Sequence, residues 1–223
     1  MDRVSTFIRH LATSRLRLTD LFNPWRDVDA DNECGRQGPA IRRANLKRYL
    51  GERLDSADCL LIGEAAGYRG CHFSGIAMCS ERMLLDRLEG VPADAVFKGP
   101  KQRTSSIAAS PQGFSEPTAS IVWRTFQMLG IDSRRVVIWN TLAFHPHQPG
   151  RPLSNRSPRE EELTAARKHL EEFLLLFPRA EPIAVGQVAG RTLAAMGHAV
   201  QVWRHPANGG ASVFRRQAAA FWS

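Results

Sequence analysis

The sequence predicts an α/β fold, a three-layer α/β/α sandwich whose central, mostly parallel sheet has four strands. Four short apolar runs, rich in β-branched residues and each followed by loop-forming residues, are typical of buried strands. Helical patterns separate these runs, and strands that alternate with helices form parallel sheets covered on both faces. The predicted strands span residues 59–62, 136–139, 183–185 and 200–203.

The helices between the strands have clear start and stop signals. The clearest begins at Ser157, which offers an N-cap followed by a proline and a glutamate placed to close a capping box, and Pro178 ends it. A second helix starts at Ser115 and ends before Gly130. Further helices are expected over residues 41–54, 80–88, 187–196 and 211–221, with a surface helix within residues 1–22.

Length and charge limit the possible architectures and partners. A chain of 223 residues with 43% hydrophobic residues can bury one sizeable core, so we expect a single domain over residues 1–223. Residues 1–40 would form an N-terminal helix and a polar connection, packed on that domain or tethered to it. The polar, turn-rich residues 27–38 predict that this connection is flexible. The net charge of +8 favours a polyanion such as nucleic acid, the alternative being a solvated basic surface.

Four cysteines without a C-x-x-C pair, and no secretion signal, favour a reduced, cytoplasmic protein of bacterial type. An iron–sulfur cluster on all four cysteines is the alternative, but Cys59 lies inside an apolar run. No stretch approaches the roughly 20 apolar residues that span a bilayer. We therefore expect no cofactor and no membrane contact.

Every predicted strand is followed directly by a segment that contains glycines or polar and titratable side chains. These segments lie where ligands bind in open α/β sheets, beyond the carboxyl ends of the strands. The glycines of the first segment let the backbone approach a ligand, but they match neither a P-loop nor a dinucleotide fingerprint. The segments are residues 63–70, 140–147, 186–187 and 204–210.

Three of these segments together resemble a known family. The run Gly63-Glu64-Ala65-Ala66-Gly67, the strand-closing Asn140 and the pair His205-Pro206 look like the three ordered motifs of the uracil-DNA glycosylase superfamily. The resemblance extends from Leu60 to about Phe214. The first motif is most similar to the G-E-A-P-G loop of the iron–sulfur glycosylases of thermophiles, and the missing C-x-x-C indicates a cluster-free branch. The resemblance implies a DNA glycosylase that removes uracil, or a related deaminated or 5-substituted base, and initiates base excision repair. It also implies a monomer, because repair glycosylases act alone on their lesion.

The resemblance also implies catalytic roles. His205 would hydrogen-bond uracil O2 as the base anion forms, and Asn140 would pair with O4 and N3, because one amide both donates and accepts. Structural alternatives are a histidine that caps a strand end and a turn-forming asparagine. Relatives with a G-Q-D-P-Y loop have an aspartate where Ala65 stands. Glu64, one residue earlier, would orient the water or only brace the loop.

Base contacts and DNA contacts are expected around the same loops. Relatives stack the flipped base on a phenylalanine where this chain has Met78, with Phe73 or Tyr68 as substitutes. Gly67 replaces a tyrosine that excludes the thymine methyl in some relatives, so a wider base range is expected. The remaining candidates are Gly63 and Ala65 for the base, and Ser74, Arg204, Asn208, Gly209 and Gly210 for DNA.

Two further loops bear on DNA binding. Residues 90–113 have the composition of a mobile surface loop, whose basic and hydroxyl side chains would either meet phosphates or be solvated. The loop after His205 offers no large apolar wedge for a flipped-out site.

Two other functions compete with glycosylase activity. His145 and His147 with His205 would form a zinc-dependent hydrolase site. A catalytically silent, damaged-DNA-binding protein of the same fold is the other rival, and the absence of an aspartate at Ala65 supports it.

Overall fold

The computed structural model describes residues 2–16 and 18–223, and a four-stranded sheet forms its centre. The strands stand in the order β3-β2-β5-β6, and each neighbouring pair runs parallel. This confirms the predicted sheet. The strands are Cys59–Ala65 (β2), Val136–Leu142 (β3), Glu181–Val185 (β5) and Gln201–Trp203 (β6).

Strands β2 and β3 extend further than predicted. The loops expected to begin at Gly63 and Asn140 begin three residues later, because the two backbones keep pairing. Gly63 lies opposite Asn140, and Ala65 lies opposite Leu142. Tertiary pairing here overrides the loop-like composition of both segments. The first two sequence motifs are therefore held on paired strand ends, which fixes their positions more firmly than loops would.

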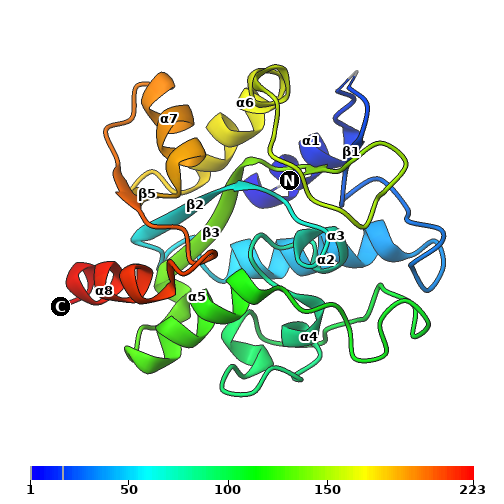
Figure 1. The fold of residues 1–223 in the computed structure, drawn as a ribbon, viewed down its shortest axis with the longest axis horizontal. Helices are drawn as coiled ribbons and strands as arrows, with labels where there is room; N and C mark the ends of the chain where they lie inside the picture. The colour runs from blue at the N-terminus through cyan, green and yellow to red at the C-terminus, as the bar shows by residue number, and fades with distance from the viewer. Residues whose placement is uncertain (1, 17) are drawn as a thin grey trace.

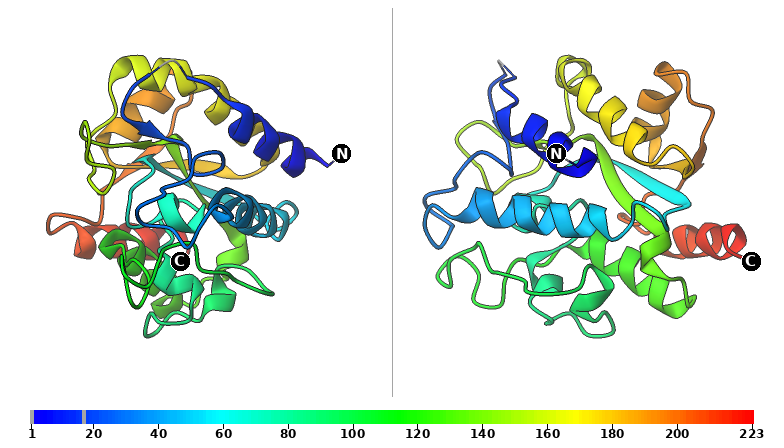
Figure 2. Two further views of the ribbon diagram at one scale, coloured as in Figure 1. Left: turned by 90° about the vertical axis from the view of Figure 1, so that its right-hand side faces the viewer. Right: turned by 180° about the vertical axis from the view of Figure 1, so that it is seen from behind.

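Helices cover both faces of the sheet, as predicted for a three-layer fold. Helices α6 and α7 lie on one side, and α2, α5 and α8 lie on the other (Figures 1 and 2). The long helices are α1 (Arg3–Thr13), α2 (Gly38–Gly51), α5 (Pro117–Met128), α6 (Glu160–Leu176), α7 (Gln187–Ala195) and α8 (Ala211–Phe221). The short elements are β1 (Leu21–Phe22), α3 (Cys71–Ser74), α4 (Glu81–Leu84), η1 (Ala93–Ala95), η2 (Ser133–Arg135) and β4 (His145–Pro146).

The start of α6 corrects the capping prediction. The helix begins at Glu160, and its N-cap is Arg159 instead of the expected Ser157. The Glu162 carboxylate accepts the Arg159 backbone N–H (2.7 Å) and also pairs with Arg156. These two contacts keep Ser157 outside the helix. The end before Pro178 is as predicted, whereas the helix expected over residues 80–88 shrinks to α4.

Helix α1 packs one face on the core, so of the two expected arrangements the helix is packed on the domain and not only tethered to it. Its Phe7 ring packs against Trp139 of β3 and Phe173 of α6, with centroids 5.4 and 6.2 Å apart. Val4 and Leu11 on the same face are also buried. In residues 2–16 and 18–223, no helix has the length and apolar character to cross a membrane.

Candidate active site

The four predicted site segments meet at the carboxyl edge of the sheet. The pairing of β2 with β3 sets Gly63 beside Asn140. The last strand, β6, ends at Trp203 and leads directly to His205, which lies next to Gly186 at the end of β5. A Cβ on Gly186 would stand 3.5 Å from the Cβ of His205. The four parallel strands therefore deliver the predicted residues to one edge.

Asn140 is a buried amide at this edge, with 3% of its surface exposed. In the orientation that satisfies its neighbours, its Nδ2 donates to the Trp139 carbonyl (3.2 Å) and its Oδ1 accepts the Ala66 N–H (3.3 Å). Backbone groups of β3 and of the first motif thus orient the amide. Each amide group has a further hydrogen-bonding position, so this side chain can still donate and accept.

Met78 and Asn140 share the space above Gly63. A methyl group at Gly63 would overlap both the Met78 Cε and the Asn140 amide. Met78 is 6% exposed and has a left-handed φ of 44°, and Trp123 Nε1 donates to its carbonyl (2.8 Å). The structure therefore brings together Gly63, Met78 and Asn140, all predicted to contact a base. Because Gly63 has no side chain, Met78 and Asn140 can occupy the space above it.

Phe73 and Ser74 do not fit their predicted roles. Phe73 is 1% exposed and stacks on Phe114 at 4.3 Å, so it belongs to the core and offers no free face to a base. Ser74 is fully buried, and its Oγ accepts the Ile76 N–H (3.0 Å). Both lie in the turn of α3, which folds inward beneath the first motif. Ser74 is therefore corrected from a DNA contact to a structural residue.

The loop that follows the first motif is held by a residue that the sequence did not suggest. Asn155 Oδ1 accepts the Tyr68 N–H (3.0 Å), and the Asn155 amide lies against the Cα side of Gly67. Ala65 remains partly exposed at the end of β2. A polar residue in a turn-rich stretch carries no signal of its own, so Asn155 could be found only from the structure.

His205 is a partly exposed, neutral imidazole. Burial lowers its pKa, which the Glu64 carboxylate opposes. Its Nδ1 accepts the Ala207 N–H (3.2 Å), so the proton of the neutral ring resides on Nε2. The partly exposed Glu64 is anchored through its backbone, because Thr141 Oγ1 donates to the Glu64 carbonyl (2.6 Å). His205 therefore presents a hydrogen-bond donor near a carboxylate.

The segment after His205 forms a tight, exposed turn. Asn208 and Gly209 adopt left-handed φ angles of 51° and 75°, and both are exposed together with Arg204. Gly210 is buried, and a Cβ there would overlap the His205 carbonyl. Arg204, Asn208 and Gly209 therefore have surface available to DNA, whereas Gly210 serves the turn itself.

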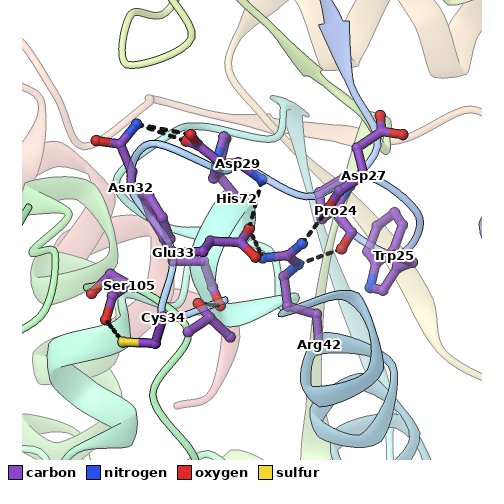
Figure 3. Close-up of polar contacts among 12 residues, drawn as sticks. Pro24, Trp25, Asp27, Asp29, Asn32, Glu33, Cys34, Arg42, His72 and Ser105 are labelled. Carbon is purple, nitrogen blue, oxygen red and sulfur yellow. Dashed lines mark hydrogen bonds and ion pairs between the residues drawn. The ribbon is translucent and has the colours of Figure 1, made fainter. Parts of the chain in front are cut away.

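Beside this edge lies a buried polar cluster, which we call the brace. It consists of Asp29, Glu33, Arg42 and His72 (Figure 3), together with His145. The Arg42 guanidinium pairs with Glu33 at 2.5 Å and donates to the backbone carbonyls of Pro24 and Asp27. Burial raises the pKa of Glu33 and lowers that of Arg42, and each partner opposes the other's shift. The expected flexible connection over residues 27–38 is therefore wrong, because this pair fixes it to α2.

A chain of hydrogen bonds runs through the brace. His145 Nε2 donates to the Ser154 carbonyl (2.8 Å), and burial lowers the His145 pKa to about 3, so its Nδ1 is an acceptor. His72 bridges His145 and Asp29: its Nδ1 lies 3.0 Å from His145 Nδ1, and its Nε2 lies 3.0 Å from Asp29 Oδ2. Burial, which Asp29 opposes, lowers the pKa of His72, whereas the contacts with His72 and Asn32 outweigh burial and lower the pKa of Asp29. Asp29, His72, His145 and the Ser154 carbonyl are thus linked in one buried chain.

This chain reaches the first motif. The backbone N–H of His72 donates to the Gly67 carbonyl (3.2 Å). Phe22 stacks on the His72 ring at 3.8 Å and shields it. The brace thus connects the N-terminal segment to the loop that carries Gly67.

A family model described as the uracil DNA glycosylase superfamily matches residues 53–221. The chain belongs to this superfamily. The match covers most of the chain, includes all three motifs and confirms the resemblance seen in the sequence. DNA glycosylase chemistry is accordingly the class of activity to which the candidate site belongs.

The fold of this glycosylase agrees with a solved structure. The crystal structure of wild-type SMUG2 from Pedobacter heparinus superposes with a TM-score of 0.62 at 10% sequence identity, over 100% of this chain and 97% of that one. At this identity the likeness establishes the fold. No curated protein matches the sequence significantly.

The zinc hypothesis finds no support in the geometry of the glycosylase. Both ring nitrogens of His145 are engaged, one by His72 and the other by Ser154. In the part of the chain that the structure describes, no group of three His, Cys, Asp or Glu side chains is placed to hold a metal ion. Cys34 is exposed, whereas Cys59, Cys71 and Cys79 are buried.

Proposed function

We propose that this glycosylase hydrolyses the N-glycosidic bond of uracil, or of a related deaminated or 5-substituted base, in DNA and so initiates base excision repair. The observation that carries the proposal is the meeting of Gly63, Met78 and Asn140 at one strand-end pair, with His205 on the same edge. Met78 supplies an apolar surface, Asn140 an amide that reads a base edge, and His205 a neutral N–H donor.

Each residue has a role in the reaction. The bond between the sugar C1′ and the base nitrogen breaks, the electron pair leaves with the base, and a water supplies the hydroxyl to C1′. His205 Nε2–H would donate to the base carbonyl that gains negative charge. The Asn140 amide would pair with the base edge. Glu64 would orient the water, because its carboxylate lies close enough to His205 to oppose the lowering of the His205 pKa by burial.

The breadth of the substrate range follows from two small or flexible side chains. Gly67 places no side chain beside the base, and Met78 offers a thioether with several rotamers in place of a rigid ring. Because Met78 and Asn140 are almost fully buried, Met78 must shift before a base can enter. We propose a site that accepts 5-substituted uracils as well as uracil, in a monomeric cytoplasmic enzyme.

The test is a strand-nicking assay. The protein is incubated with uracil-containing single- and double-stranded oligonucleotides, and abasic sites are then cleaved with alkali. The expected result is a nick at uracil, strongly reduced in Asn140→Ala and His205→Ala variants that retain the circular dichroism of the parent. No product from either substrate across a range of lesions would refute the proposal. Parental rates in both variants would show that the active site lies elsewhere.

A second candidate is a silent damaged-DNA-binding protein of the same fold. The partly exposed Ala65, which offers no carboxylate at the position of the water-activating aspartate, favours it. Binding to an abasic duplex without any nicking in the same assay would select this candidate.

A further inference from the structure

The loop between β2 and α3 completes the first motif and is held along its length. The Gly67 carbonyl accepts the backbone N–H groups of Gly70 and His72 (3.2 Å each). The Tyr68 N–H donates to Asn155 Oδ1 (3.0 Å). These hydrogen bonds hold the backbone of the loop in one conformation, so a side chain on it starts from a fixed position.

Arg69 is the exposed charged side chain of this loop, and its neighbour orients it. Its Nε donates to the Tyr68 hydroxyl (2.7 Å), and its guanidinium carbon lies 5.2 Å from the centroid of the Tyr68 ring. The Tyr68 ring packs edge-on against Phe114, with centroids 6.3 Å apart. Arg69 is therefore tethered to an anchored ring, and its guanidinium occupies a face of Tyr68 that was a candidate for base stacking.

The backbone of this loop ties Arg69 to the base-reading amide. Ala66, three residues before Arg69, donates its N–H to Asn140 Oδ1 (3.3 Å). Three residues of chain span at most about 11 Å, so Arg69 starts within that distance of Ala66. On the same edge, the exposed Arg204 follows β6, which is separated from β2 by β5 alone. Exposed arginines thus follow two different strands of the edge that carries the candidate site.

The charge of Arg69 has no counter-charge in the described chain. The Tyr68 hydroxyl is the one hydrogen-bond partner of its side chain there, and Nη1 and Nη2 are free. Exposed arginines elsewhere are neutralised, since Arg26, Arg135 and Arg167 each pair with a carboxylate at 2.5–2.8 Å. An oriented guanidinium with two free terminal nitrogens is suited to an anion with two adjacent oxygens.

Residues 90–113, the other segment expected to meet phosphates, turn two of their three cations into the loop itself. The Arg103 guanidinium donates to the Ser105 carbonyl (2.6 Å), and Lys101 pairs with Asp94 at 2.6 Å. Neither of the roles expected for these two cations fits, because they hold the loop instead of meeting phosphates or solvent. The free guanidinium of Arg69 is therefore the better candidate for a phosphate.

We propose that Arg69, oriented by Tyr68, binds a backbone phosphate of the strand that carries the target base. Nη1 and Nη2 pair with two oxygens of one phosphodiester. The proposal rests on the proposed function and adds to it a positioning contact on the loop of the first motif. Because every nucleotide carries a phosphate, the contact serves single and double strands alike and is independent of the base.

The first test measures the salt dependence of binding without catalysis. The probe is a fluorescent single-stranded oligonucleotide with a tetrahydrofuran abasic site, titrated by anisotropy between about 50 and 200 mM salt. Arg69→Gln is expected to bind about tenfold more weakly at the lower salt. The slope of log affinity against log salt should become shallower by about 0.7, the value for one phosphate contact to a single strand. A parental slope in Arg69→Gln would overturn the proposal.

Arg179→Gln is the matched control. Arg179 is exposed and lies between α6 and β5, at the opposite edge of the sheet. The substitution removes the same charge far from the site, so affinity and slope should be those of the parent. Equal losses in Arg69→Gln and Arg179→Gln would overturn the proposal, because they would reflect net charge alone.

Two conservative variants separate charge from orientation. Arg69→Lys keeps the charge and loses the planar fork, and Tyr68→Phe keeps the ring and loses the hydroxyl tether. Both should bind more weakly than the parent but with the parental salt slope, and circular dichroism checks that they fold. Parental affinity in Arg69→Lys would overturn the bidentate contact, and parental affinity in Tyr68→Phe would overturn the orienting role of Tyr68.

Excision of uracil gives a separate readout. In single-turnover assays, Arg69→Gln should raise the half-saturating protein concentration about tenfold and leave the rate at saturation nearly unchanged, as expected for a contact that serves binding. A lower saturated rate at parental half-saturation would overturn the phosphate contact. If even the parent excises no base, the proposed function fails, and the binding experiments still decide the role of Arg69.

Discussion

The brace and the candidate site lie at the same edge of the sheet, but the polar side chains of the brace are hydrogen-bonded whereas two of those in the site leave polar atoms free. In the brace, Arg42, His72 and His145 are fully buried, and their ring and guanidinium nitrogens meet acceptors or donors. In the site, the Glu64 carboxylate and His205 Nε2 make no hydrogen bond with any residue that the structure describes. Buried polar groups need partners, so the paired groups of the brace hold the fold. The partly exposed Glu64 and His205 can leave these atoms without a protein partner, and the atoms remain free to contact a ligand.

The largest effect should come from breaking the brace. Arg42→Ala leaves Glu33 buried without its partner, and loss of one member of a buried ion pair costs about 3–5 kcal/mol. Urea unfolding would measure this loss. Lys47→Ala on the same helix is the control, because the exposed Lys47–Asp2 pair should contribute within about 1 kcal/mol. Equal losses in the two variants would mean that the brace is not a stabilising element.

A substitution in the site should lower activity and leave stability nearly unchanged. His205→Ala removes a donor to the leaving base and is expected to lower the single-turnover rate by about 10²–10³-fold, as for other single donors to a developing anion. Its free energy of unfolding should change little, because the ring is partly exposed and makes one weak hydrogen bond. A large loss of stability with normal activity would reverse the distinction between the two regions.

Glu116 is an exception to this contrast, because it is buried and yet unpaired. Its Oε2 lies against Gly70 with no hydrogen-bond partner in the described chain. Burial raises its pKa to about 7, so the native protein binds a proton that the unfolded chain releases near 4.5. Stability should therefore fall as pH rises from about 4.5 to 7, by about 3 kcal/mol at most.

The Glu116→Gln variant isolates this effect. It cannot ionise, so its stability relative to the parent should be lowest near pH 4.5 and should rise up to pH 8. Unfolding free energies of both proteins across this range would measure the change. A difference that does not vary with pH would show that Glu116 titrates normally.

The smallest effect tests the packing of the site. Gly63→Ala forces the Met78 thioether and the Asn140 amide apart, and overpacking of this kind costs about 1–3 kcal/mol. Gly51→Ala at the end of α2 is the matched control, because a Cβ there meets nothing within 4 Å. We expect Gly63→Ala alone to impair base excision. Normal excision by this variant would remove Gly63 from the site.

The sequence predicted the elements whose signals are local. Apolar runs located the four strands, and periodicity with caps located α8 over the predicted residues and α5 within two residues at each end. Strand ends and the start of α6 were misplaced, because the pairing of Gly63 with Asn140 and the Arg156–Glu162 contact depend on partners that local patterns do not include.

The candidate site was predictable only in part. Asn140 and His205 were identified by motif and place on the sheet, and Met78 by standing where relatives have a stacking phenylalanine. Phe73 was misjudged because its burial depends on Phe114, 41 residues away. The brace left no signal in the sequence, since the partners Asp29 and His72 lie in separate segments and a turn-rich composition is also typical of flexible connections.

The packing of α1 on Trp139 and the anchoring of Asp29 to His72 separate the folding unit from the region that the family shares. The family match begins at residue 53, but Phe7, Glu33 and Arg42 precede it. A chain shortened to residues 53–221 would expose the aromatic surface around Trp139 and leave His72 without its hydrogen-bond partner Asp29. Domain boundaries taken from the family match would therefore cut through the core, and expression of that segment alone should yield an aggregating protein.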